Sequence, residues 1–129
     1  MIFSHTLDFV LSRRKTQTRR LARPDQTLIR EGNRQVVAMT TAKGHRVVYQ
    51  VGKTYAIQPA RTLKAVAHMT LTGIREEAVQ EISEADARAE GYKSQEEFLA
   101  AWRTIHGAKA DMQQRVWVLE FRLWEEDRR

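Results

Sequence analysis

The stretch Arg13-Arg14-Lys15-Thr16-Gln17-Thr18-Arg19-Arg20 holds five cations in eight residues, with two threonines and a glutamine between them. A polyanion-binding tail would be equally basic but would not need hydroxyls and an amide at alternating positions. The mixture therefore predicts an ordered loop that presents several kinds of hydrogen-bonding group together. Lys15 and Thr18 would point to opposite faces of a strand, but they could converge on one ligand in a helical turn or tight bend. A solvated basic surface without a site is the alternative.

Length and composition limit the classes of protein that this chain can be. A chain of 129 residues is most simply one domain, 1–129, and 42% hydrophobic content is enough for a packed core. The absence of cysteine excludes disulfides, thiolate metal sites and a cysteine nucleophile. No apolar run approaches the roughly 20 residues that a bilayer requires, and none resembles a signal peptide. We expect a soluble, cytoplasmic protein with no membrane partner.

Charge is distributed unevenly along the chain. Residues 1–64 carry 13 Lys and Arg against 3 Asp and Glu, net +10, whereas residues 65–129 carry 9 against 13, net −4. Such asymmetry favours an anionic partner for the N-terminal half, most often a nucleic acid. The alternative is solubilising charge that happens to cluster.

The N-terminal half is predicted to form one short helix and several short strands. Thr6 can cap a helix whose Leu7, Val10 and Leu11 lie at helical spacing and face the core. The region 20–35 has little periodicity and is expected to be a long, mobile, basic loop. Strands are predicted at 36–41, 45–51 and 54–58, and a turn at 42–44 joins the first two as a hairpin.

The C-terminal half is predicted to contain two strands and two capped helices. A strand at 64–74 alternates in polarity, and Ser83 and Ser94 each begin a capping box. Gly91 and Gly107 end the two helices. In the second helix, an apolar stripe is interpreted as core contact and not as a cofactor site; it consists of Phe98, Leu99, Trp102 and Ile105. The last strand places Trp117, Leu119, Phe121 and Leu123 on one face, and 125–129 are expected to be a frayed tail.

Five predicted strands and a few short helices favour an α+β fold. They fit a small, mostly antiparallel β-barrel with helices packed outside, because closure removes the edges that short strands would otherwise expose.

At four places the chain resembles the ASCH domain family, a branch of the PUA-like fold. Residues 14–20 look like the signature Gly-Arg-Lys-Thr-x-Thr-x-Arg, with Arg13 where the signature has glycine. The other three places are a strand start at 51–59, a helix region at 86–92 followed by Glu97, Phe98 and Trp102, and the closing strand at 116–121. The matches follow the family's order along nearly the whole chain. The segment between Arg20 and Val51 is an addition relative to the compact enzymes of the family.

The resemblance implies a basic cleft that binds RNA or a nucleoside-like ligand. One small bacterial member is an amidohydrolase that deacetylates N(4)-acetylcytidine with a lysine, a threonine three residues later and a distant glutamate. By motif position, these catalytic roles fall on Lys15, Thr18 and Glu90. A threonine hydroxyl is a weak nucleophile that needs a base, and a lysine can be that base if burial or nearby cations lower its pKa. Glu90 would oppose that shift but could orient the amine.

Further residues are candidates for binding the ligand, and no cofactor or metal is expected. Tyr49, Tyr55 and Tyr92 could stack on a base or pack in the barrel, and His5, His45, His68 and His106 lack a ligand spacing, so no zinc is predicted. The predicted nucleic-acid or ligand contacts are Arg13, Arg14, Gln17, Arg19, Arg20, Tyr55, Gln58, Arg61 and Lys64.

Three functions are consistent with the sequence. The first is an RNA-binding module, the second is the amidohydrolase, and the third is a ribonuclease that would need a general acid and base beside a phosphate. Neither the ligand nor the oligomeric state follows from the sequence.

Overall fold

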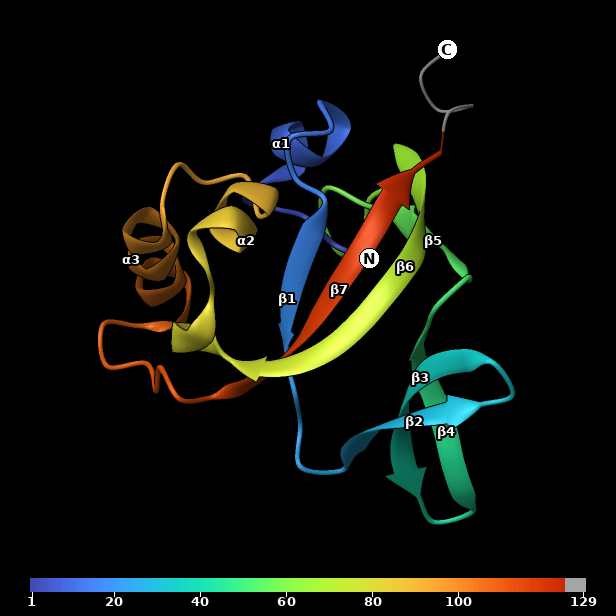
Figure 1. Ribbon diagram of the computed structural model, residues 1–129. Helices are drawn as coiled ribbons and strands as arrows, with labels where there is room; N and C mark the ends of the chain where they lie inside the picture. The colour runs from blue at the N-terminus through green and yellow to red at the C-terminus, as the bar shows by residue number, and fades with distance from the viewer. Residues whose placement is uncertain (125–129) are drawn as a thin grey trace.

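The computed structural model describes residues 1–124, which form seven β-strands, three α-helices and one short 3₁₀ turn at Val79–Glu81 (Figure 1). The strands are β1 (Gln17–Leu21), β2 (Gln26–Glu31), β3 (Arg34–Thr41), β4 (Gly44–Gln50), β5 (Thr54–Ile57), β6 (Ala67–Ala78) and β7 (Arg115–Leu123). The helices are α1 (Leu7–Leu11), α2 (Glu84–Ala89) and α3 (Gln95–His106). The predicted α+β class is confirmed. The tail expected at 125–129 lies outside the described residues.

The strands pair antiparallel in two sheets. Four strands form one sheet in the order β1–β7–β6–β5, and β2, β3 and β4 form a second sheet in sequence order. The second sheet lies on the opposite side of the molecule from α2 and α3 (Figure 1). The mostly antiparallel pairing is therefore confirmed, whereas closure of the strands into one barrel stays a prediction.

The region 20–35 differs from the mobile loop that was predicted. It contains the end of β1 and all of β2, which pairs with β3 from Gln26 opposite Met39 to Glu31 opposite Arg34. All six side chains of β2 are half-buried or exposed, so the strand has no buried face of its own. Backbone hydrogen bonds to β3, which is more apolar, hold β2 in place.

The core lies on both faces of β7. On one face, Trp117, Leu119, Phe121 and Leu123 pack with residues of β5, β6 and the N-terminal segment, as the alternation predicted. On the other face, Val116 and Val118 pack against the two C-terminal helices through Ala87, Phe98 and Trp102. Because β7 is buried on both faces, it fixes the position of the helices relative to the sheet.

The basic stretch is divided between a turn and a strand. Residues 13–16 form the connection after α1, and the rest of the stretch is β1, an edge strand that pairs only with β7. The prediction of a continuous loop was therefore wrong from Gln17 onward. Side chains alternate along β1, so Thr18 and Arg20 share one face while Gln17 and Arg19 share the other.

The helix caps follow the prediction, but two expected core contacts do not. The Ser83 and Ser94 hydroxyls accept hydrogen bonds from the backbone N–H of Asp86 and Glu97, at 3.0 and 3.1 Å. Leu11 and Ile105 are 40% and 45% exposed, whereas Val10 is fully buried. No helix within 1–124 is long and apolar enough to cross a membrane.

Candidate functional site

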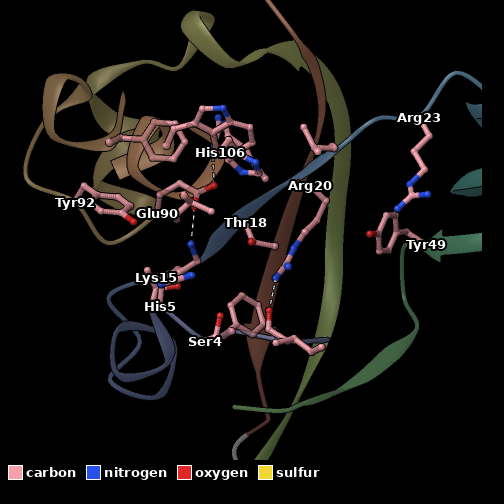
Figure 2. A pocket seen from close by; sticks show the side chains of 18 of the residues that line it. Ser4, His5, Lys15, Thr18, Arg20, Arg23, Tyr49, Glu90, Tyr92 and His106 are labelled. Atoms are coloured by element: carbon pink, nitrogen blue, oxygen red, sulfur yellow. Dashed lines mark hydrogen bonds and ion pairs between the residues drawn. The ribbon is translucent and has the colours of Figure 1, made fainter. Parts of the chain in front are cut away.

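A cavity of about 460 Å³ opens beside the edge strand β1 (Figure 2). Its walls come from the N-terminal segment, β1, the turn into β2, β4, the end of α2 and one face of α3. The lining residues that bear on its chemistry are Lys15, Thr18, Arg19, Arg20, Arg23, Tyr49, Glu90, Tyr92, Phe98, Trp102 and His106. A concave site of this size, with a few convergent polar groups, is typical of small-molecule binding.

Lys15 and Glu90 form a buried ion pair in the wall of this cavity. The Lys15 Nζ donates to Glu90 Oε1 at 2.5 Å, and both side chains are almost fully buried. Burial lowers the pKa of Lys15, and the Glu90 carboxylate opposes that shift. The positive charges of Arg20 and Arg19 add to the lowering of the pKa. The fold thus brings together two groups that lie 75 residues apart in sequence.

Backbone contacts hold the two partners in place. Lys15 N donates to Phe9 O at 2.9 Å and Thr16 N donates to Ala89 O at 2.7 Å, so the turn is fastened to both α1 and the end of α2. Glu90 is the C-cap of α2, and the next residue, Gly91, has a φ of 99°. A Cβ at Gly91 would lie 2.5 Å from the ring of Phe9. Glycine is therefore required here both for backbone conformation and for close packing.

Thr18 lines the same cavity from β1. It is only 3% exposed, and its hydroxyl makes no hydrogen bond to any residue of 1–124. Figure 2 places it between Lys15 and Arg20. A hydroxyl without an internal partner can interact with a ligand that enters the cavity.

Arg19 connects Glu90 to a larger ion-pair network. Its guanidinium donates to Glu90 Oε2 at 3.0 Å and to Glu77 Oε1 at 2.6 Å, and it also contacts Asp86 at 3.4 Å. Gln17 accepts from Arg19 and donates to Asp86, each at 3.1 Å. Arg19 is thus neutralised by carboxylates, and it holds Glu90 on the side opposite Lys15.

Arg20 lies in the cavity without a carboxylate partner. Its Nη2 donates to the carbonyl of Ile2 at 2.8 Å, and its guanidinium lies over the ring of Phe3, 5.0 Å from the centroid. Its buried Nε has no hydrogen-bond partner within the described chain. Burial lowers the pKa of Arg20 from its usual value, and the nearby Tyr49 and Glu90 oppose that shift.

Side chains of α3, most of them aromatic, form one wall of the cavity. Phe98 and Trp102 pack in the core and also line the cavity, and Ile105 and His106 complete that face of α3. The rings of Trp102 and His106 lie 4.0 Å apart. The predicted core contact of this stripe is confirmed for Phe98 and Trp102, which line the cavity as well. Trp102 and His106 are four residues apart, about one helical turn, and this spacing is the sequence feature that could have indicated that they share one face of α3.

Other predicted ligand contacts lie outside the cavity. The Tyr55 hydroxyl accepts from Gln50 N at 2.9 Å, the Gln58 amide donates to Leu63 O at 3.0 Å, and Arg14 lies over the ring of Phe9. The cavity lining also excludes Arg13, Gln17, Arg61 and Lys64. Their roles in ligand binding stay predictions. Conversely, Arg23 and Gln26 line the cavity but were not predicted, because no periodicity in the region around them indicates a strand.

The residues within 1–124 contain no cluster of three or more His, Cys, Asp or Glu with the geometry to hold a metal ion.

Two solved structures share this arrangement of strands and helices. One is the ASCH domain from Lactobacillus crispatus JV V101, with a TM-score of 0.59 and 18% identity over 90% of this chain and 68% of that one. The chain has the fold of an ASCH domain. A DUF984 protein from Enterococcus faecalis V583 is also similar, with a TM-score of 0.53 and 15% identity over 90% of this chain and 67% of that one. No protein-family model and no curated protein matches the sequence.

One position explains how the signature is accommodated in this ASCH fold. Arg13 stands where the family signature has glycine, and it has a φ of 67°. This left-handed region favours glycine. Arg13 thus adopts a backbone conformation that glycine adopts more readily.

Proposed function

We propose that this protein is an amidohydrolase that removes an acyl group from the exocyclic amine of a cytosine-type nucleoside, such as N(4)-acetylcytidine. The observation that supports this most strongly is the buried Lys15–Glu90 pair, 2.5 Å apart, in a cavity that Thr18 also lines. Lys15, Thr18 and Glu90 are the residues on which the family resemblance places the catalytic roles.

Each residue has a role that its surroundings support. Burial lowers the pKa of Lys15, so its amine is more readily neutral and able to accept a proton. The neutral amine takes the proton of the Thr18 hydroxyl as Thr18 Oγ1 attacks the acyl carbonyl carbon. Glu90 accepts a hydrogen bond from the Lys15 amine and so orients its lone pair.

The reaction then runs in two balanced steps. The C–N bond breaks as Lys15 returns the proton to the leaving amine, and the acyl group stays on Thr18 as an ester. Water, deprotonated by Lys15, attacks this ester, and the carboxylic acid leaves as Thr18 recovers its proton. No redox partner or cofactor is required.

The test is incubation of the purified protein with N(4)-acetylcytidine, followed by chromatography of cytidine and acetate. Thr18→Val, Lys15→Met and Glu90→Gln are each expected to lower the rate strongly, and their combination is expected to add little, because the residues act as a unit. Thr72→Val and Lys93→Met, at exposed positions outside the cavity, are the matched controls. If Thr18→Val releases cytidine at the wild-type rate, Thr18 is not the nucleophile.

RNA binding without catalysis is the second candidate. It is favoured by the net charge of +10 in residues 1–64, and by Arg20 and Arg23, which make no ion pair with a carboxylate of residues 1–124. If the protein binds RNA but releases no cytidine, this candidate replaces the amidohydrolase.

A further inference from the structure

One end of the cavity has positive charge that the protein itself does not neutralise. Lys15 pairs with Glu90, and Arg19 pairs with Glu77, Asp86 and Glu90. Arg20 and Arg23 also line the cavity, but neither has an ion pair within residues 1–124. The cavity therefore keeps two guanidinium groups that pair with no carboxylate of residues 1–124, although Glu90 is near enough to Arg20 to raise its pKa.

The two arginines converge on Tyr49 from different elements. Arg20 belongs to β1, Arg23 to the turn between β1 and β2, and Tyr49 to β4 of the second sheet. Both guanidinium groups favour the ionised form of the Tyr49 hydroxyl and so oppose the rise in its pKa that burial causes. Figure 2 shows the Arg23 side chain directed toward Tyr49.

Both guanidinium groups retain hydrogen-bonding capacity. The Arg20 Nε is buried without a partner, and the side chain of Arg23 makes no hydrogen bond in the part of the chain that the structure describes. A buried donor without an acceptor is costly, and phosphate oxygens are the acceptors that planar guanidinium groups bind best. A tyrosine hydroxyl beside them can donate to the same group.

From this geometry we infer that Arg20, Arg23 and Tyr49 form a phosphate subsite, so that a phosphate-bearing cytosine derivative binds more tightly than the free nucleoside. This inference rests on the proposed function for the identity of the base, but not for the presence of the phosphate. The phosphate can be that of a mononucleotide or that of an RNA strand. The subsite depends on the second sheet, because that sheet supplies Tyr49 and follows directly from the turn that carries Arg23.

The test compares the dissociation constants of cytidine, cytidine 5′-monophosphate and a cytidine trinucleotide without terminal phosphates, by calorimetric titration at low salt. The wild-type protein is expected to bind at least one phosphate-bearing probe about tenfold or more tightly than cytidine. Stronger binding of the mononucleotide assigns the phosphate to a nucleotide, and stronger binding of the trinucleotide assigns it to RNA.

Arg23→Gln is the decisive variant, because Arg23 is exposed and its replacement should not affect folding. It is expected to remove most of the preference for the phosphate-bearing probes over cytidine. Arg46→Gln, at an exposed position on β4 outside the cavity, is expected to keep the preference.

The outcomes separate this inference from the proposed function. Equal affinity for cytidine and both phosphate-bearing probes overturns the inference, even if N(4)-acetylcytidine is hydrolysed. A phosphate preference that Arg23→Gln abolishes supports it, even if no acyl group is released. A preference that survives Arg23→Gln, or an absence of binding by all three probes, overturns the subsite.

Discussion

At the scale of single residues, the distinctive feature is Lys15, because its neighbours have opposite effects on its pKa. Burial and the nearby arginines lower the pKa of Lys15, whereas the carboxylate of Glu90, at 2.5 Å, raises it. The net effect is a pKa of Lys15 below the usual value for a lysine. A buried charge pair of this kind is a weak source of stability, because desolvation offsets much of the attraction. Under the proposed function, the pair serves catalysis and contributes little to stability.

The pH dependence of deacylation tests this balance. Because neutral Lys15 is the proposed base, the rate should rise with pH through an apparent pKa below that of an ordinary lysine. Glu90→Gln removes the negative charge that raises the pKa of Lys15, so the rising limb should move to lower pH while the maximal rate falls. Glu96→Gln, on the exposed side of α3, should leave the limb in place. A shift to higher pH in Glu90→Gln would contradict the assignment of Lys15 as base.

Gly91 provides a second test at this scale. Gly91→Ala adds a Cβ in a left-handed conformation and places it 2.5 Å from the ring of Phe9. Gly107→Ala meets the same kind of backbone strain, with a φ of 106°, but no atom lies within 4 Å of the new Cβ. We expect Gly107→Ala to lower the free energy of unfolding by about 1–2 kcal/mol. Gly91→Ala should cost a further 1–3 kcal/mol or so.

Denaturant titration of both glycine variants measures this difference. Equal losses would mean that Phe9 moves aside without cost.

At the scale of elements, the sequence predicted strands and helices best where apolar residues recur. The alternation of β7 and the two serine caps of α2 and α3 were sufficient to place those elements. β1 was missed because its buried residues are Gln17, Thr18 and Arg19, which carry no hydrophobic periodicity. Tertiary ion pairs, which depend on residues 58 to 71 positions away, are what bury Arg19.

The candidate site was predictable only where a local motif indicated its residues. A motif resemblance indicated Lys15, Thr18 and Glu90, and the fold brings all three to one cavity. Arg23 and His106 could not be placed there from the sequence, because their convergence depends on how the second sheet and α3 pack around β1. Tyr49 was predicted only as one of three tyrosines that could stack on a base, and not as a neighbour of Arg23. Local patterns do not determine that packing.

Two tryptophans in different elements have different surroundings: Trp117 lies in the core alone, and Trp102 lies in the core and also lines the cavity. Trp117 on β7 is buried among core side chains, and its indole N–H donates to Gln26 Oε1 at 2.8 Å. Trp102 on α3 packs in the second core cluster but also lines the cavity. Trp117→Ala should lower the free energy of unfolding by about 3–5 kcal/mol. Trp102→Ala should lower both stability and affinity for cytidine.

Denaturant unfolding and ligand titration of the two tryptophan variants separate the effects. Loss of binding in well-folded Trp117→Ala, with normal binding in Trp102→Ala, would reverse the two assignments.

At the scale of the whole molecule, the two halves of the chain meet in the Arg19 network. The basic half supplies Lys15 and Arg19, and the acidic half supplies Glu77, Asp86 and Glu90. Burial of these pairs uses little of the net +10 in residues 1–64, so most of the remaining cations face solvent or the cavity. The charge asymmetry of the sequence is therefore only partly explained by internal pairing, and the remainder is available to a polyanion.

The last prediction concerns the salt dependence of RNA binding. If the exposed cations of residues 1–64 contact phosphates, affinity for single-stranded RNA should fall steeply as salt rises, because bound counterions are released. Arg61 and Lys64 are both exposed, three residues apart in the connection between β5 and β6. Replacing both with glutamine should reduce the slope of log K against log salt by about 1.4, which is about 0.7 for each lost phosphate contact.

The double variant Lys93→Gln with Lys109→Gln is the control, because it removes the same charge from the acidic half and should leave the slope unchanged. Fluorescence anisotropy of a labelled oligonucleotide at several salt concentrations gives both slopes. Equal slopes in the two double variants would mean that RNA senses only net charge, and binding that persists at high salt would mean that base contacts, not phosphates, dominate.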